Sequence, residues 1–95
     1  MPNFAIRVEL KGYPTVNEYQ ALHTLMAKKG FSQTIPGIDT QGNRRSFDLP
    51  HAVYYGTSVE NCYAVRDGVL SSIKREVQDD VLVFVVQEQG WAIGS

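Results

Sequence analysis

Histidine side chains are the ones in this chain that could move protons during a reaction. His23 lies beside an apolar row, between Leu22 and Leu25, and its imidazole titrates near neutrality, so it could act as a general acid or base. A partly buried helix histidine held by a hydrogen bond would have the same sequence environment. His51 follows Pro50 and is either a second proton-transfer candidate or an ordinary residue at the edge of a turn.

Arginine and tyrosine side chains could bind a phosphate and a base. Arg44 and Arg45 are adjacent in a turn-rich segment and could hold one phosphate as a bidentate pair, although this pattern is more typical of exposed arginines at a hairpin tip. Arg7 belongs to the outward face of the first alternating segment. Tyr54 and Tyr55 should point to opposite faces of a strand, which leaves one for the core and one for stacking on a base.

Other chemistries find little support in the residue types. Cys62 is the single cysteine, so no internal disulfide and no cysteine metal set can form. Asp79 and Asp80 would need further oxygen ligands to hold a divalent ion, and a turn before a strand is the simpler interpretation. No Ser-His-Asp or Cys-His spacing is present. We therefore expect neither a metal site nor a cofactor.

The first half of the chain should position His23. Residues 3–11 alternate between apolar and polar and predict a half-buried strand. Residues 15–18, Thr-Val-Asn-Glu, match a capping box, so a helix should begin after Thr15 and end at Gly30. A short strand is expected over residues 31–35, followed by a turn-rich loop that reaches Pro50.

The second half repeats the same succession of elements. A third strand is expected over residues 51–56, and residues 57–60, Thr-Ser-Val-Glu, suggest a second capping box with a helix that runs to about Arg75. Residues 81–87 predict a last strand. The order strand, helix, strand, strand, helix, strand predicts an α+β, ferredoxin-like β-α-β-β-α-β domain over residues 1–88. Its four-stranded antiparallel sheet should carry both helices on one face.

The last strand and the tail suggest a partner. Residues 81–86 are apolar on both faces, and in the expected order this strand lies at a sheet edge, where an exposed apolar strand invites pairing. We expect a homodimer, with the tail over residues 89–95 as a possible dimer arm. Alternatively, the tail, which contains Trp91 and Ile93, folds back over the strand of its own chain.

Length and charge set limits on location and partners. The 95 residues suffice for one domain, and nine Lys and Arg oppose ten Asp and Glu, for a net charge of −1. Extended duplex DNA binding needs a basic excess, so DNA is not an expected partner, whereas a local basic patch could still contact a short single strand. The first residues lack a signal-peptide pattern and no apolar run approaches a membrane span, so a cytoplasmic protein without a membrane partner is expected.

Over about residues 4–70, the chain resembles the GhoS-type endoribonuclease antitoxins of type V toxin–antitoxin systems. The matching residues are the strand over 4–10, Tyr13-Pro14, Tyr19, Leu22-His23-Thr24-Leu25-Met26, Gly30-Phe31-Ser32, Gly42 followed by Arg44, and Thr57-Ser58 ahead of Glu60. Most of these are core and turn positions. The Tyr-Pro pair and the Leu-x-x-Leu-Met-x-x-x-Gly-Phe-Ser spacing are the most specific.

The resemblance implies a function as well as a fold. It implies a ferredoxin-like fold akin to the small CRISPR-associated nucleases, and neutralisation of a small membrane toxin by cleavage of its messenger RNA. His23 stands where the family carries a basic residue. On this hypothesis His23 is the acid or base of a metal-independent endoribonuclease, and Arg7, Arg44 and Arg45 contact RNA phosphates. The alternative is a non-catalytic homodimeric binding module that holds a protein or a small ligand on its sheet.

Overall fold

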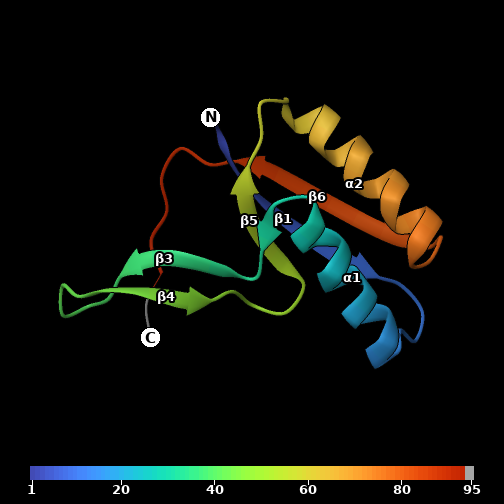
Figure 1. The fold of residues 1–95 in the computed structure, drawn as a ribbon, viewed down its shortest axis with the longest axis horizontal. Helices are drawn as coiled ribbons and strands as arrows, with labels where there is room; N and C mark the ends of the chain where they lie inside the picture. The colour runs from blue at the N-terminus through green and yellow to red at the C-terminus, as the bar shows by residue number, and fades with distance from the viewer. Residues whose placement is uncertain (94–95) are drawn as a thin grey trace.

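The computed structural model describes residues 1–93 as a four-stranded sheet, two helices and a separate hairpin (Figure 1). In chain order the elements are β1 (Asn3–Leu10), α1 (Val16–Lys28), β2 (Phe31–Ser32), β3 (Thr34–Ile38), β4 (Arg44–Asp48), β5 (Val53–Thr57), α2 (Cys62–Glu76) and β6 (Val81–Gln87). The sheet order is β2-β5-β1-β6, and every neighbouring pair is antiparallel. The prediction of an α+β fold with two helices and a four-stranded antiparallel sheet is confirmed.

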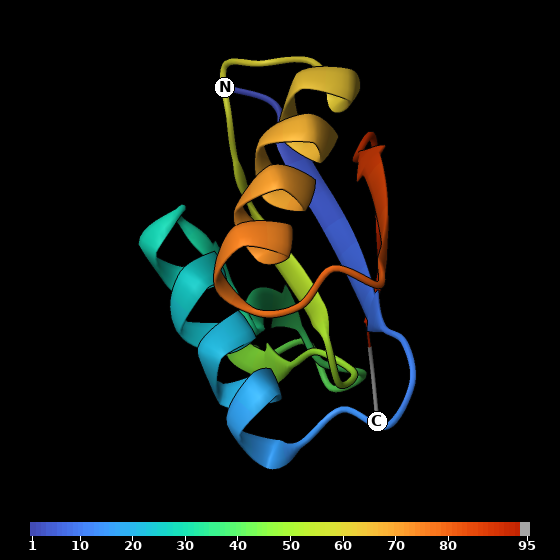
Figure 2. The ribbon, with the colours of Figure 1, turned by 90° about the vertical axis from the view of Figure 1, so that its right-hand side faces the viewer.

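The main core lies between one face of this sheet and the two helices. The alternating apolar residues of β1 are all buried, as their spacing predicts. They form one cluster with buried side chains of both helices: Phe4, Ile6, Val8 and Leu10 of β1, Leu22, Leu25 and Met26 of α1, and Val65, Val69 and Ile73 of α2. Both helices therefore cover the same face (Figure 2), which leaves the other face of the sheet open.

Helix α1 begins where the capping box predicts. The Glu18 backbone N–H donates to the Thr15 hydroxyl at 3.1 Å, and the Thr15 backbone N–H donates to the Glu18 carboxylate at 3.0 Å. These two bonds satisfy donors that the first helical turn leaves unpaired. At the other end, Gly30 adopts a positive φ of 89°, which glycine accepts without strain. Local sequence is therefore sufficient to place the helix that carries His23.

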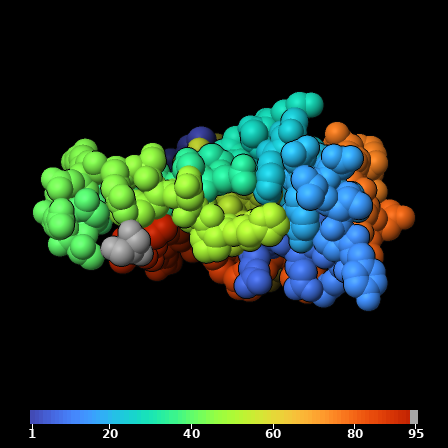
Figure 3. Space-filling model, turned by 90° about the horizontal axis from the view of Figure 1, so that it is seen from below, coloured from blue at the N-terminus to red at the C-terminus, as the bar shows by residue number. Residues whose placement is uncertain are grey.

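The segment expected as a turn-rich loop is instead a β-hairpin. Strands β3 and β4 pair antiparallel as a separate two-stranded sheet, and β2 contains only Phe31 and Ser32. The prediction of one strand over residues 31–35 was therefore wrong. Pro36 and Gly37 do not stop a strand here because they lie in a hairpin that projects beyond the main sheet, as Figures 1 and 3 show.

The expected start of the second helix was also wrong. Thr57 is the last residue of β5, where it pairs with Asn3, and the helix cap is Asn61, whose side chain accepts from the Ala64 N–H at 2.9 Å. The Ser58 hydroxyl accepts from the Glu60 N–H at 3.1 Å, in a local turn. Thr57 therefore pairs with β1 as a strand residue and does not cap the helix, although its sequence context matches a capping box. The third core strand likewise runs over Val53–Thr57 rather than over residues 51–56.

The tail crosses the open face of the sheet within its own chain. The Trp91 ring packs edge-on against Tyr55, with 6.0 Å between centroids, and a Cβ on Gly37 would meet the Ile93 side chain. The tail thus runs beside the hairpin (Figure 3) rather than over β6. Gly94 and Ser95, the last residues of the proposed dimer arm, lie outside the described residues.

Candidate functional site

His23 forms one end of a cluster of imidazole and phenol rings between α1 and β5. It lies on α1, partly buried, and its Nδ1 is 2.6 Å from the hydroxyl of Tyr54, which is fully buried on β5. The Tyr19 ring, one helical turn before His23, has its centroid 6.4 Å away. His23 is therefore the hydrogen-bonded, partly buried helix histidine that its sequence environment allowed. The same contact determines how its ring is oriented.

His51 reaches the same cluster from the turn that joins β4 to β5. Its exposed ring lies 5.8 Å from the His23 ring and 4.3 Å from the Tyr19 ring, centroid to centroid. The Val53 N–H closes the turn on the Pro50 carbonyl at 3.0 Å. Figure 3 shows this yellow-green segment against the blue of α1.

A strained residue holds this turn in place. Ala52 has a φ of 60°, the only positive φ of a non-glycine residue in the part of the chain that the structure describes. The left-handed conformation costs about 1–2 kcal/mol for such a residue. The Ala52 carbonyl accepts from the Val8 N–H at 3.0 Å, which ties the turn to β1. Residues in such conformations often occur at functional sites, and here the strained residue is adjacent to His51.

The surroundings of the cluster favour a neutral His23. Burial, and then the nearby His51, lower the pKa of His23 below its usual value. Burial also raises the pKa of Tyr54, so its hydroxyl keeps its proton and remains able to donate. A neutral imidazole beside a protonated phenol is an arrangement that can accept a proton at neutral pH.

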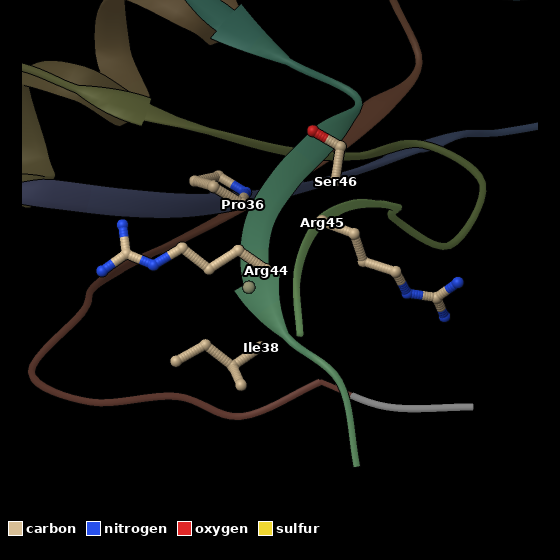
Figure 4. Close-up of a pocket in the computed structure, with 6 residues that line it drawn as sticks. Pro36, Ile38, Arg44, Arg45 and Ser46 are labelled. Atoms are coloured by element: carbon tan, nitrogen blue, oxygen red, sulfur yellow. The ribbon is translucent and has the colours of Figure 1, made fainter. Parts of the chain in front are cut away.

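The paired arginines lie on the hairpin, away from the histidines. Arg44 and Arg45 are exposed residues of β4 and line an open pocket of about 450 Å³. Figure 4 shows their side chains leaving the strand in opposite directions, as neighbouring strand residues do. The Arg45 guanidinium stacks over the Phe47 ring at 4.2 Å. The two arginines therefore do not form the bidentate pair that their adjacency suggested.

Arg7 lies on the other side of the sheet from His23. It is exposed on β1, between buried neighbours that face the helices, and its strand partners are Val53 and Phe84. As predicted for adjacent residues, Tyr54 is in the core, whereas Tyr55 lies on the open face beside Trp91. Of the four candidate site residues, the structure thus separates His23, Arg7 and the arginine pair into three places.

The structure adds residues that the sequence did not assign to the site. Tyr19 and Tyr54 complete the cluster around the two histidines. For His51, the only signal in the sequence was its position directly after Pro50, at the expected start of a strand. Within residues 1–93, no three or more His, Cys, Asp or Glu side chains gather as metal ligands would. Across the same residues, every helix is too short or too polar to cross a membrane.

Comparisons with known proteins give no relative. No protein-family model, no curated protein and no solved structure matches this chain.

Proposed function

We propose that this chain is an RNA-acting antitoxin of the endoribonuclease type, which cleaves single-stranded or messenger RNA in the cytoplasm by proton transfer. The observation that carries the proposal is the meeting of His23 and His51, which lie far apart in the sequence and 5.8 Å apart between ring centroids. The resemblance to GhoS-type antitoxins supplies the substrate class. The order β2-β5-β1-β6 supports the ferredoxin-like part of the proposal, because it places the four core strands in the order second, third, first, fourth.

The two imidazoles have suitable roles for RNA transesterification. His23, neutral because of its lowered pKa, accepts the proton of the ribose 2′-hydroxyl. The 2′-oxygen then attacks the adjacent phosphorus, and the bond to the 5′-oxygen breaks, which gives a 2′,3′-cyclic phosphate. His51 in its protonated form donates a proton to the departing 5′-oxygen, so that charge and protons balance. Nε2 of His23 accepts the 2′-hydroxyl proton in the tautomer that carries the ring hydrogen on Nδ1, so Nδ1–H donates to the Tyr54 hydroxyl and proton exchange with RNA uses Nε2.

The hairpin connects the paired arginines to the turn that carries His51, so one RNA strand can contact both. Strand β4 leads from Arg44 and Arg45 to the turn that contains His51. At a rise of about 3.3 Å per residue, the six steps from Arg45 to His51 span at most about 20 Å. The arginines therefore contact phosphates that flank the cleaved one. Arg7 contacts only RNA that continues over the open face.

The test is cleavage of an A/U-rich RNA by purified protein in EDTA. His23→Gln and His51→Gln should each lower the single-turnover rate by about 100-fold or more, the usual contribution of a proton-transfer group. Tyr54→Phe keeps the ring but removes the hydroxyl, so the pH profile of the rate should shift. Thr24→Ala, an exposed neighbour of His23 on α1, is the matched control and should cleave like the parent.

RNA contact is measured separately through its salt dependence. The double variant Arg44→Ala, Arg45→Ala should weaken RNA binding and lower the slope of log affinity against log salt by roughly one per lost contact. Cleavage that survives both histidine variants would contradict the proposed site. Absence of both cleavage and salt-dependent binding would contradict the proposed function.

A non-catalytic binding module is the second candidate, and the open sheet face favours it. Tyr55, Phe84 and Trp91 are accessible there, while the net charge of the chain is −1. A protein or small-molecule ligand on this face would need neither histidine. Unaltered ligand binding by His23→Gln would identify such a module.

A further inference from the structure

Strand β6 is apolar along its length, yet none of its residues is buried. Residues 81–86 read Val-Leu-Val-Phe-Val-Val. On the open face, Leu82 is 48 %, Phe84 57 % and Val86 40 % exposed. The valines between them face α2 but are only partly covered. Side chains on both faces of this strand are therefore incompletely covered. A partner that lay only on the open face would cover one face and leave the other as it is.

The outer edge of β6 offers backbone groups for pairing. The strand is the last in the order β2-β5-β1-β6 and forms an edge of the sheet in Figure 2. The Glu88 N–H donates to the Asn3 carbonyl, and the Lys11 N–H donates to the Asp80 carbonyl. Even-numbered residues thus direct their backbone groups to β1. By strand alternation, Val81, Val83, Val85 and Gln87 direct theirs outward.

Natural edge strands usually carry a feature that prevents such pairing, and β6 lacks the common ones. Residues 81–87 contain no lysine, no other charged residue and no proline, and each of them keeps its regular partner on β1 without a bulge. The β2 edge differs, because β2 has only two residues. Of the two edges of the four-stranded sheet, β6 is therefore the one that can pair with a second copy of the chain.

We propose that a second copy of this chain pairs with β6, antiparallel and about a twofold axis at Phe84. Such an arrangement is isologous, so each copy uses the same surface. Val83 then forms a hydrogen-bonded pair with the partner's Val85, and Leu82 lies opposite the partner's Val86. Five of the six apolar residues lie opposite apolar residues of the partner, Val81 lies opposite the partner's Gln87, and no charge lies opposite a like charge within residues 81–87.

RNA is a poorer occupant of this surface. Strand β6 itself offers no cation to neutralise phosphates: Arg7, which pairs with Phe84, lies on β1 and not on the outer edge, and Lys11 is already paired with Glu9 at 2.7 Å. At the ends of the proposed pair, Asp80 lies opposite the partner's Glu88. Salt screens this repulsion, so salt should strengthen the dimer, whereas it would weaken an RNA complex.

Sedimentation velocity across a concentration series tests the pairing. The parent chain should be a dimer. Phe84→Glu places two like charges opposite each other at the axis and removes an aromatic pair, so it should raise the dimer dissociation constant by about tenfold or more. Val83→Pro removes an outward N–H and should also give a monomer. Val83→Ala retains that N–H and is its matched control, which should still dimerise.

Circular dichroism confirms that each variant folds, and if Val83→Pro does not fold, Val85→Pro replaces it, because it removes the other outward N–H of the same pair. A parent chain that stays monomeric at high concentration would overturn the proposal, whether or not it binds a single-stranded RNA probe. A dimer that survives both Phe84→Glu and Val83→Pro would overturn it as well. Loss of the dimer only with Phe84→Glu would indicate face-to-face stacking and contradict edge pairing.

Discussion

At the scale of single residues, the Tyr54 hydroxyl orients the His23 ring through its contact with Nδ1. A phenol can donate to Nδ1 or accept from it, so this contact is compatible with either protonation state of the ring. Burial and the neighbouring His51 both lower the pKa of His23, because both disfavour the charged imidazolium. His23 is thus held neutral by its surroundings and oriented by a partner that does not titrate near neutrality.

This environment predicts that acid destabilises the protein through His23. The native pKa of His23 lies below the unfolded value of about 6.5, so the unfolded chain binds a proton that the native chain resists. Stability is therefore full above the unfolded pKa, falls as pH drops through it, and levels off below the native pKa. Melting temperatures at about pH 8 and about pH 5.5 should show the loss, and His23→Gln should reduce it. Equal losses in the parent and the variant would contradict this prediction.

At the scale of the elements, local signals predict structure where no distant partner competes. The capping box at Thr15 and Glu18 places α1 correctly, because both bonds lie within one helical turn. The same pattern misplaced α2, because Thr57 is held by its pairing with Asn3, on a distant strand. Asn61, which caps α2, is of a residue type that is preferred at helix starts. The capping-box pattern over residues 57–60 lies just before it and led the prediction to the wrong start.

The candidate site could be predicted only in part for the same reason. His23 stood out because its neighbours on α1 are apolar. Its proximity to His51 depends on the strand order and on the strained turn at Ala52, neither of which a linear pattern specifies. The hairpin was missed because Pro36 and Gly37 disfavour strands, whereas Phe47 of the paired strand and Ile93 of the tail lie against Gly37 there.

The helix caps give a prediction with an internal control. Thr15→Val and Asn61→Ala should each lower the free energy of unfolding by about 1 kcal/mol, since each removes the oxygen that accepts from the first turn. Thr57→Val should change it by less than about 0.5 kcal/mol, because Thr57 is an exposed strand residue. Urea denaturation of the three variants measures this. A large loss with Thr57→Val would mean that the helix begins earlier than the structure shows.

At the scale of the whole molecule, the protein has two separate apolar regions. The main cluster lies between the helices and the sheet, and Ile35 and Phe47 of the hairpin are buried outside it. The molecule is 42 Å in its longest dimension and 19 Å in its shortest. The hairpin extends the molecule in Figure 3 and packs beside the tail. Few contacts join the hairpin to the main core, so its stability is expected to be partly independent.

Hydrogen exchange should resolve the two regions. Phe47→Ala should speed exchange of the β3 and β4 amides while leaving the β1 amides protected, because the lost packing belongs to the hairpin. Phe4→Ala, at a fully buried position of the main core, should cost about 3–5 kcal/mol and speed exchange throughout. Uniform acceleration by Phe47→Ala would instead indicate a single cooperative unit.

The central position of β1 has a consequence for synthesis on the ribosome. Its two sheet neighbours are β5 and β6, and β6 follows β1 by about seventy residues of chain. At about 5–20 residues per second, β1 is made roughly 4–15 s before β6 exists. During that interval its apolar row can pack only against α1 and whatever else has emerged. A chain of this topology therefore cannot close its sheet until β6 has been made, and a translational pause before β6 would prolong the exposure of β1.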